Sequence, residues 1–484
     1  MSICISSLVT IDKRDLCGII VLRAAAHGRK QIGNGKQKTD MTTCPLFKNI
    51  ILYTLPVMAT GILQFLYNAA DTVVVGRFAA DSETSLAAVG STGSLSNLIT
   101  GLFMGLSVGA GVSISHALGA GKRDTCKNIV HTAISSAAII GVLLALVGYF
   151  TARPLLALTG VPDEVLGSAS LYMRTVFLGM PALVLYNFAA AIFNARGDTK
   201  HPFFFLLASG TLNVMLNLVF VVGFKLDVLG VAIATVASQY LSAFLILRLL
   251  SGLDDDCRLD IKHLYIRKAE LLKMIRIGLP AGLQGCVFAL SNVIIQSSIN
   301  SFGKPCMAAN TAASNLDGLI YIALNSFYHS SLAFTGQNYG ARRFDRIARV
   351  RRICLSSVAV FGVALGGGVY VFGRQLLALY GVTEPDVQSI AMTRLLFLGV
   401  PYFTCGMMEV LSGMLRGVGR SATSMIISLL GACVFRIVWI YTVFQVDRSI
   451  ESLYISYPIS WVLTTAVSYI VLRTVLRRER RVSA

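Results

Sequence analysis

The chain has 484 residues, of which 55% are hydrophobic and only 14% are charged. A soluble protein of this length carries about 25% charged residues, so the composition excludes an ordinary soluble domain and indicates a membrane protein. The formal net charge of +18 would also suit a nucleic-acid-binding protein. The basic residues lie in the loops between apolar runs, however, which is typical of membrane topology signals.

The first residues differ from the rest of the chain. Residues 1–45 form a polar, basic N-terminal extension that we expect to be disordered. Its one apolar run, residues 16–22, is too short and too broken for a signal peptide. Because Met41 begins a suitable lead into the first long apolar run, we expect residues 1–40 to be dispensable.

Apolar runs of about 20 residues follow along the whole chain, each long enough to cross a hydrocarbon layer of about 30 Å. They predict an all-α integral membrane protein with twelve transmembrane helices. The predicted spans are residues 51–76, 86–116, 129–150, 168–193, 203–222, 229–250, 275–302, 306–335, 353–372, 388–413, 422–445 and 453–475.

The two halves of the chain repeat each other. Phe-Leu-Gly-Met-Pro at 177–181 returns as Phe-Leu-Gly-Val-Pro at 397–401, and Leu-Leu-Ala-Leu at 155–158 returns at 376–379. Six spans in each half give both halves the same orientation, so we expect two six-helix lobes related by a pseudo-two-fold axis along the membrane normal. Duplicated halves of this kind are typical of secondary transporters. The predicted parts are an N-lobe at 46–250, a linker at 251–273, a C-lobe at 274–475 and a basic tail at 476–484.

Lys and Arg are distributed unevenly between alternate loops. One set of loops, with the linker and the tail, holds 23 of them, Arg196 and Arg416 included. The other set holds six: Arg77, Arg153, Lys225, Lys304, Arg374 and Arg448. The positive-inside rule therefore predicts a multi-pass membrane protein with both termini in the cytoplasm. Arg174 and Arg394, near the starts of two spans, are expected to snorkel toward the interface.

An ionisable residue inside a span costs a few kcal/mol and needs a reason to be there. Asp71, late in the first span, is the first such residue. It is either an interface residue paired with Arg77 or a group that binds a cation or proton. Polar residues on later spans of the N-lobe, which could form an oxygen-rich cation pocket with it, are Asn187, Asn213, Asn217 and Thr235. Each of these could also make ordinary hydrogen bonds between helices.

Three further ionisable residues lie in the predicted C-lobe spans. Glu409 and Arg436 are expected at similar depth, either as a structural ion pair or as a gate or sensor of substrate charge. Asp317, with Tyr321 and its aromatic neighbours, could line a cavity suited to organic cations, although the aromatic residues could equally be packing residues.

The order and spacing of several motifs resemble those of the MATE (multidrug and toxic compound extrusion) transporters of bacteria. They include Leu-Pro at 55–56, the run 64–71, Gly-Asp-Thr-Lys-His-Pro at 197–202, the run 212–217 and Arg-Gly-Val-Gly at 416–419. The resemblance covers about residues 46–475. It implies two lobes forming a V, and export of cationic or amphipathic compounds against Na⁺ or H⁺, without any other cofactor.

The same resemblance implies roles for particular residues. A family cation site in the N-lobe maps to Asp71, Asn187, Asn213, Asn217 and Thr235, and Pro56 matches a proline associated with bending of the first helix. The family often has Asp where this chain has Asn217, so one carboxylate is missing here. The implied location is a bacterial cytoplasmic membrane. The implied partners are a small-molecule substrate and the lipid bilayer, with no nucleic acid, and the protein is expected to act as a monomer.

Other classes of function remain as alternatives. A flippase for a lipid-linked precursor would need a basic cavity, whereas the spans are predicted to hold three acids and one Arg. An enzyme is disfavoured, because the sequence has no clustered catalytic residues and no metal-type spacing among its ten cysteines. A channel is disfavoured because the two halves, although related, are not symmetric enough to form a symmetric pore.

Overall fold

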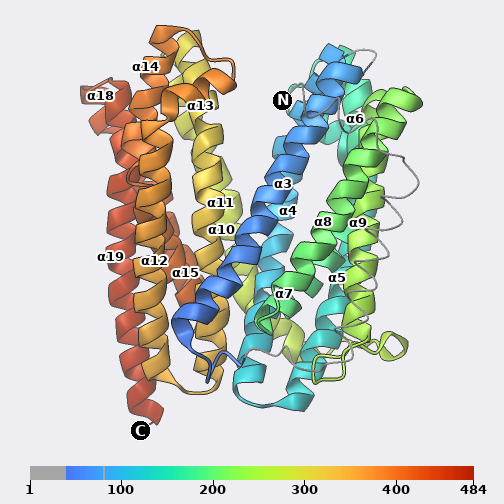
Figure 1. Ribbon diagram of the computed structural model, residues 1–484, viewed down its shortest axis with the longest axis vertical. Helices are drawn as coiled ribbons and strands as arrows, with labels where there is room; N and C mark the ends of the chain where they lie inside the picture. The colour runs from blue at the N-terminus through green and yellow to red at the C-terminus, as the bar shows by residue number, and fades with distance from the viewer. Residues whose placement is uncertain (1–39, 80–81, 484) are drawn as a thin grey trace.

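The computed structural model describes residues 40–79 and 82–483. All regular structure within these ranges is helical, and the helices form two bundles that stand side by side (Figure 1). The predictions made for residues 1–39 lie outside the described residues.

The N-terminal bundle contains six spans, two of which have a change in helix type or direction. Its elements are α3 (Leu46–Phe78), α4 (Ser82–Gly119), α5 (Arg123–Leu158), α6 (Asp163–Leu178), α7 (Met180–Ala195), α8 (Lys200–Asn217), η1 (Leu218–Gly223) and α9 (Asp227–Ser251). The helices α6 and α7 form one span that bends by 46° next to Pro181, whose ring cannot continue the regular backbone hydrogen bonds.

The C-terminal bundle follows after a linker that contains η2 (Ile261–His263). Its elements are α10 (Lys268–Asn300), α11 (Lys304–Gly340), α12 (Phe344–Val371), α13 (Gly373–Leu379), α14 (Pro385–Arg394), η3 (Leu395–Gly399), α15 (Tyr402–Gly417), α16 (Ser421–Ser428), η4 (Leu429–Val434), α17 (Phe435–Tyr441), α18 (Val443–Val446) and α19 (Ile450–Ser483).

The described helices account for twelve spans, but not all of them are equally apolar. Ten are long and apolar enough to cross a membrane, and the bent pair α6 and α7 gives an eleventh. The remaining one, α11, has 37 residues but includes polar groups such as Asn310, Asp317 and His329. Its side chains lie largely inside the protein, which explains why a polar helix can stand at this position.

The repeat seen in the sequence is also a repeat of backbone geometry. Residues with positive φ recur in pairs at the repeat spacing: Gly121 and Arg342 at 67° and 55°, Gly160 and Gly381 at 77° and 80°, and Gly197 and Gly419 at 86° and 79°. The two bundles therefore turn their chains in the same way at corresponding loops. They also meet in corresponding pairs, because α4 packs on α10 and α3 packs on α11. This pairing confirms two lobes related by a pseudo-two-fold axis.

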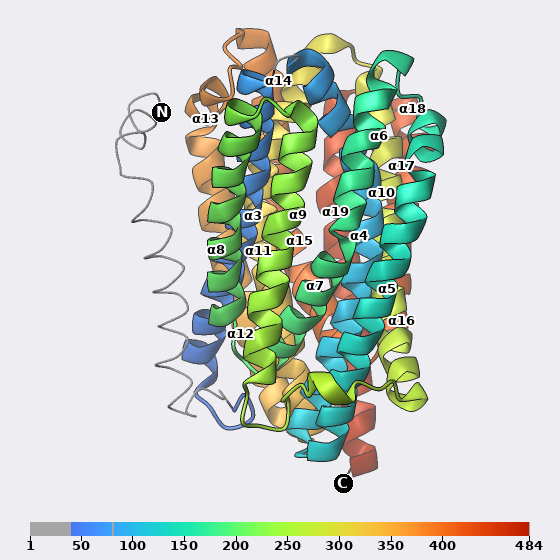
Figure 2. The same cartoon turned by 90° about the vertical axis from the view of Figure 1, so that its right-hand side faces the viewer.

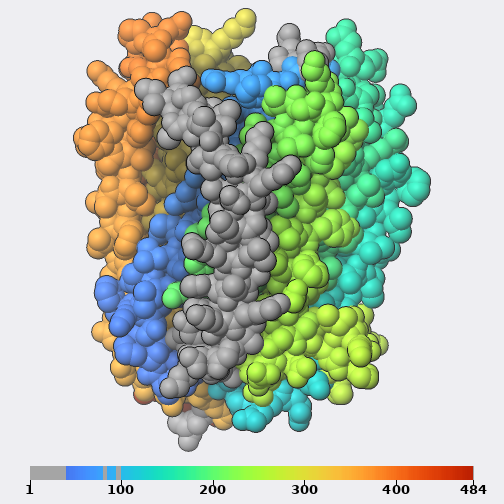
Figure 3. All heavy atoms as spheres, turned by 45° about the vertical axis from the view of Figure 1, so that its right-hand side comes forward, coloured from blue at the N-terminus to red at the C-terminus, as the bar shows by residue number. Residues whose placement is uncertain are grey.

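The helix α3 belongs to both bundles. Its first turns, with Ile50 and Tyr53, lie in a core shared with α11 and α12 of the C-terminal bundle. Its last turns, with Val74 and Val75, pack on Val221 and Val231 of the N-terminal bundle. In Figure 1, α3 accordingly crosses from beneath one bundle to the side of the other. Figure 2 shows it behind α8 and α9 of the N-terminal bundle, and Figure 3 shows its start against the C-terminal bundle.

The bundles are in closest contact at one end, which we call the linker end because the linker and the end of α19 lie there (Figure 1). A Cβ added at Gly105 would lie 2.1 Å from the backbone nitrogen of Gly282, and one at Gly119 would lie 1.9 Å from the carbonyl oxygen of Gln337. Small residues therefore allow backbone to approach backbone between the bundles.

Side chains join the bundles at the same end. The Nε2 atom of His116 on α4 lies 2.7 Å from the carbonyl oxygen of Gly417. Gln337 on α11 donates to the carbonyl oxygen of Ala195 at 2.6 Å and accepts from the backbone N–H of Met41 at 3.3 Å. These bonds hold the linker end closed.

Candidate functional site

Four of the five predicted cation-site residues lie together at the far end of the N-terminal bundle. Asp71 on α3 is half-buried, and its Oδ1 atom accepts a hydrogen bond of 2.5 Å from Nδ2 of Asn217. Asn213, one turn earlier on α8, lies 3.4 Å from Asn217 and also 3.4 Å from the hydroxyl of Thr235 on α9. The four-residue spacing of the two asparagines places both amides on the helix face toward α3 and α9.

The cluster contains one carboxylate and no cation to neutralise it. No ion pair joins Asp71 to Arg77, both of which belong to the described part of the chain, and Arg77 is exposed. Asn217 is fully buried, and its Oδ1 atom has no hydrogen-bond partner among the described residues. One carboxylate with amide and hydroxyl oxygens is a donor set that suits a hard monovalent cation or a proton.

The fifth predicted residue, Asn187, lies elsewhere. Its Nδ2 atom donates to the carbonyl oxygen of Leu183 in its own helix, α7, at 2.8 Å. Its side chain lines the cavity between the bundles and does not join the hydrogen-bonded chain of Asp71. Asn187 therefore lies outside the hydrogen-bonded cluster of Asp71 among the described residues, and its part in the cation site stays a prediction.

A cavity of about 660 Å³ lies between the two bundles. Its wall on the N-terminal side comes from α4 and α7, with Met104, Ser107 and Asn194. The wall on the C-terminal side comes from α10, α11, α15, α17 and α19 and carries most of the aromatic and all of the charged groups. An apolar lining with a few polar groups is typical of sites for small molecules.

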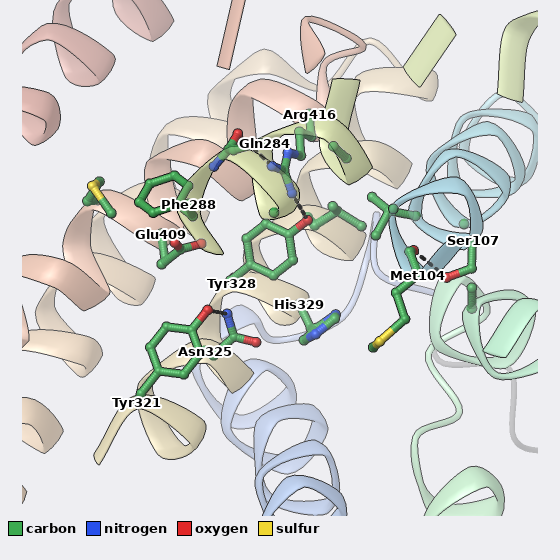
Figure 4. Close-up of a pocket in the computed structure, with 18 of the residues that line it drawn as sticks. Met104, Ser107, Gln284, Phe288, Tyr321, Asn325, Tyr328, His329, Glu409 and Arg416 are labelled. Atoms are coloured by element: carbon green, nitrogen blue, oxygen red, sulfur yellow. Dashed lines mark hydrogen bonds between the residues drawn. The ribbon is translucent and has the colours of Figure 1, made fainter. Parts of the chain in front are cut away.

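The predicted cavity residues Tyr321 and Glu409 do line this space (Figure 4). Tyr321 is 39% exposed to it, and its hydroxyl accepts a hydrogen bond of 3.3 Å from Asn325. The carboxylate of Glu409 makes no hydrogen bond or ion pair with the described residues. In Figure 4 it lies beside Phe288 on one side of the cavity.

Arg436 lines the same cavity but does not pair with Glu409, so the predicted ion pair is wrong. Its Nε atom donates to the hydroxyl of Ser460 at 2.9 Å. Its guanidinium lies 4.0 Å from the ring centre of Tyr457 and 5.6 Å from that of Trp461, which are cation–π distances. Equal depth in neighbouring helices predicted the pair, but the wide helical turn η4 and the aromatic groups of α19 direct Arg436 to another partner.

Asp317 does not line the cavity and forms an ion pair that the sequence did not predict. It is 2% exposed, and its Oδ2 atom accepts a hydrogen bond of 3.0 Å from Nε of Arg394. Arg394, the last residue of α14, also donates to Asn310 of α11 and is buried, so it does not snorkel. The substrate-cavity role expected for Asp317 is thus replaced by a structural one.

Two basic residues assigned to loops are also buried. Arg416, near the end of α15, donates to the hydroxyl of Tyr328 at 2.6 Å and to Oε1 of Gln284 at 2.8 Å, as Figure 4 shows. Arg196 pairs with Asp255 of the linker. With Arg394 and Arg436, Arg416 brings the buried arginines of the C-terminal bundle to three, so the predicted excess of acids in the spans is wrong.

The protein is an all-helical membrane protein of two repeated six-helix bundles. A cavity lies between the bundles, and a separate polar cluster around one carboxylate lies in one of them. This is the architecture of a secondary transporter. The family model MatE matches residues 56–219 and 280–442. The chain belongs to this family, the MATE transporters, and is therefore a membrane transporter and no enzyme.

Relatives agree with this assignment. The probable multidrug resistance protein YoeA of Bacillus subtilis (strain 168) is 27% identical over 391 residues, which cover 79% of this chain and 84% of YoeA. The multidrug export protein MepA of Staphylococcus aureus (strain MSSA476) is 25% identical over 403 residues, 82% of this chain and 87% of MepA.

Solved structures share the fold. A multidrug resistance MATE family transporter of the MOP superfamily in an outward-facing conformation has a TM-score of 0.85 at 21% identity, covering 92% of this chain and 99% of that one. A MOP superfamily transporter from Pyrococcus furiosus also has a TM-score of 0.85 at 21% identity, covering 91% and 98%, and is described as having a binding pocket of reverse polarity.

Proposed function

We propose that this protein is a secondary active efflux transporter that exports organic cations or amphipathic drugs in exchange for Na⁺ or H⁺. YoeA and MepA are named for multidrug resistance and multidrug export, which supports the substrate class. The linker end, where the basic loops gather, faces the cytoplasm in this proposal.

The observation that carries the proposal is the placement of Asp71. Its carboxylate has an amide partner, Asn217, but no cationic one among the described residues. A carboxylate left without a counter-ion inside a membrane span is unfavourable by about 3 kcal/mol, so binding a proton or Na⁺ there stabilises the local structure. Binding of the ion is therefore favourable, and no positively charged side chain among the described residues competes with it for Asp71.

Coupling to the substrate follows from α3. Because this helix packs on the C-terminal bundle at its start and on the N-terminal bundle at its end, a change at Asp71 acts on both bundles. Pro56 lies between the two contact regions, and its missing N–H makes this the point where the helix can bend. Ion binding at one end then favours one arrangement of the bundles, and substrate in the cavity favours the other.

The test is efflux from proteoliposomes that contain the purified protein, under an imposed Na⁺ gradient or pH gradient in turn. We expect one of the two gradients to drive cationic dyes against their concentration, and protein-free liposomes to show none of this transport. Gradient-independent movement of a lipid-linked sugar without any dye transport would contradict the proposal and favour the flippase.

A further inference from the structure

The cavity between the bundles carries two opposite charges that do not neutralise each other. Glu409 on α15 has no partner among the described residues, whereas Arg436 on α17 is held by Ser460 and by two aromatic rings. Both side chains line the cavity. Two opposite charges that line one cavity without pairing with each other are able to bind two opposite charges of one ligand.

Arg436 has fewer side-chain acceptors than the other buried arginines of the C-terminal bundle, which bond to two each, although the Nε atom of Arg416 also has no acceptor among the described residues. Arg394 has a carboxylate and an amide as acceptors, and Arg416 has a phenol and an amide. Arg436 is 4% exposed, yet its Nη2 atom is buried without any acceptor among the described residues. Leaving a buried N–H of a charged group unpaired is unfavourable, so the site favours a ligand that supplies an anionic oxygen.

The rings of Tyr457 and Trp461 stabilise Arg436 and leave its positive charge able to bind a ligand. Their faces stabilise the guanidinium through its cation–π attraction without neutralising it. A protein carboxylate bonded to Arg436 would neutralise its positive charge in the cavity, but the buried acid Asp317 pairs with Arg394 instead. Arg436 therefore remains positive and open to an anion.

We propose that the preferred substrates are dipolar, with a carboxylate or similar anionic group bound by Arg436 and a cationic group bound by Glu409. This inference rests on the proposed transport function and narrows its substrate class. A simple organic cation satisfies Glu409 but leaves Arg436 unpaired, and it also meets the positive charge of Arg416 in the same cavity. A dipolar molecule satisfies both unpartnered groups at once.

The test compares a rhodamine dye whose carboxyl group is free with the methyl ester of the same dye. These probes differ in one negative charge and are nearly equal in shape. Wild-type protein should prefer the free acid, and Arg436→Gln should weaken its transport by about ten- to a hundred-fold, through KM, because a charge-assisted hydrogen bond is lost. Transport of the ester should be unchanged or improved, and Arg436→Lys should restore part of the preference.

Direct dye binding to the detergent-solubilised protein, measured by fluorescence polarisation, separates this inference from the transport proposal. If no gradient drives either dye but Arg436→Gln selectively weakens binding of the acid, the transport proposal fails and the dipolar site stands. If Arg436→Gln weakens both dyes equally or neither, the inference is overturned, since Arg436 is then only structural. Glu409→Gln should weaken both dyes, and loss of the acid alone would also overturn the assignment.

Discussion

The buried pair of Asp317 and Arg394 should be a main source of stability in the C-terminal bundle. Its Nε–Oδ2 distance of 3.0 Å corresponds to an attraction of about 5 kcal/mol at an effective dielectric constant of about 20. Removing one partner leaves the other charged and buried, so Asp317→Asn should lower the free energy of unfolding by about 3–5 kcal/mol. Arg394 would then have neutral amide acceptors, Asn310 among them, in place of a carboxylate.

Unfolding by SDS in mixed micelles, followed by tryptophan fluorescence, measures this change. Both tryptophans of the chain, Trp439 and Trp461, lie in the same bundle as the pair and report its unfolding. The matched control is Asp345→Asn, because Asp345 pairs with Arg480 on the exposed surface at 3.3 Å. That pair should contribute about 0–1 kcal/mol.

The double variant Asp317→Asn, Arg394→Gln completes the test. Replacing both charges with amides removes the uncompensated charge, so the double variant should be more stable than Asp317→Asn alone. Two results would refute this reasoning. In one, Asp317→Asn lowers the free energy of unfolding no more than the exposed control does; in the other, the double variant lowers it by the sum of the two single changes.

Three further changes test the fold and its motions. Gly105→Ala places a Cβ against the backbone of Gly282, so it should destabilise the contact between the bundles by about 1–3 kcal/mol and raise hydrogen exchange there. Gly101→Ala is the control and should have neither effect, because its added Cβ would have no atom within 4 Å. Pro56→Ala restores a backbone N–H within α3 and should slow transport at least several-fold while leaving dye binding unchanged. The backbone of Arg342 has the left-handed conformation, with φ at 55°, which is unfavourable for a residue with a side chain. Arg342→Gly removes this strain and should stabilise the protein by about 1 kcal/mol in the SDS assay.

Much of the fold was predictable from hydrophobic runs and the internal repeat. The spacing of Asn213 and Asn217 also predicted their common helix face, and the structure bonds Asn217 both to Asp71 and to Asn213. These features depend on local periodicity and on the order of the spans. Both are properties of the sequence alone.

Long-range partners of the buried charges were not predictable in the same way. Arg394 at the start of a predicted span is indistinguishable by sequence from an arginine that snorkels, and only tertiary packing places it against Asp317. Arg416 lies next to a turn motif, yet it bonds inward to Tyr328 and Gln284. Local periodicity gives the face of a helix on which each charge lies, but not the helix that faces it.

The central claim is that Asp71 binds the driving ion without taking part in substrate binding. Uphill transport and passive exchange of labelled for unlabelled substrate, measured in the same proteoliposomes, separate these two roles. Asp71→Asn should abolish gradient-driven accumulation and leave exchange within about two-fold of wild type, since the cavity residues are untouched. Gradient-driven accumulation that survives in Asp71→Asn would contradict the account.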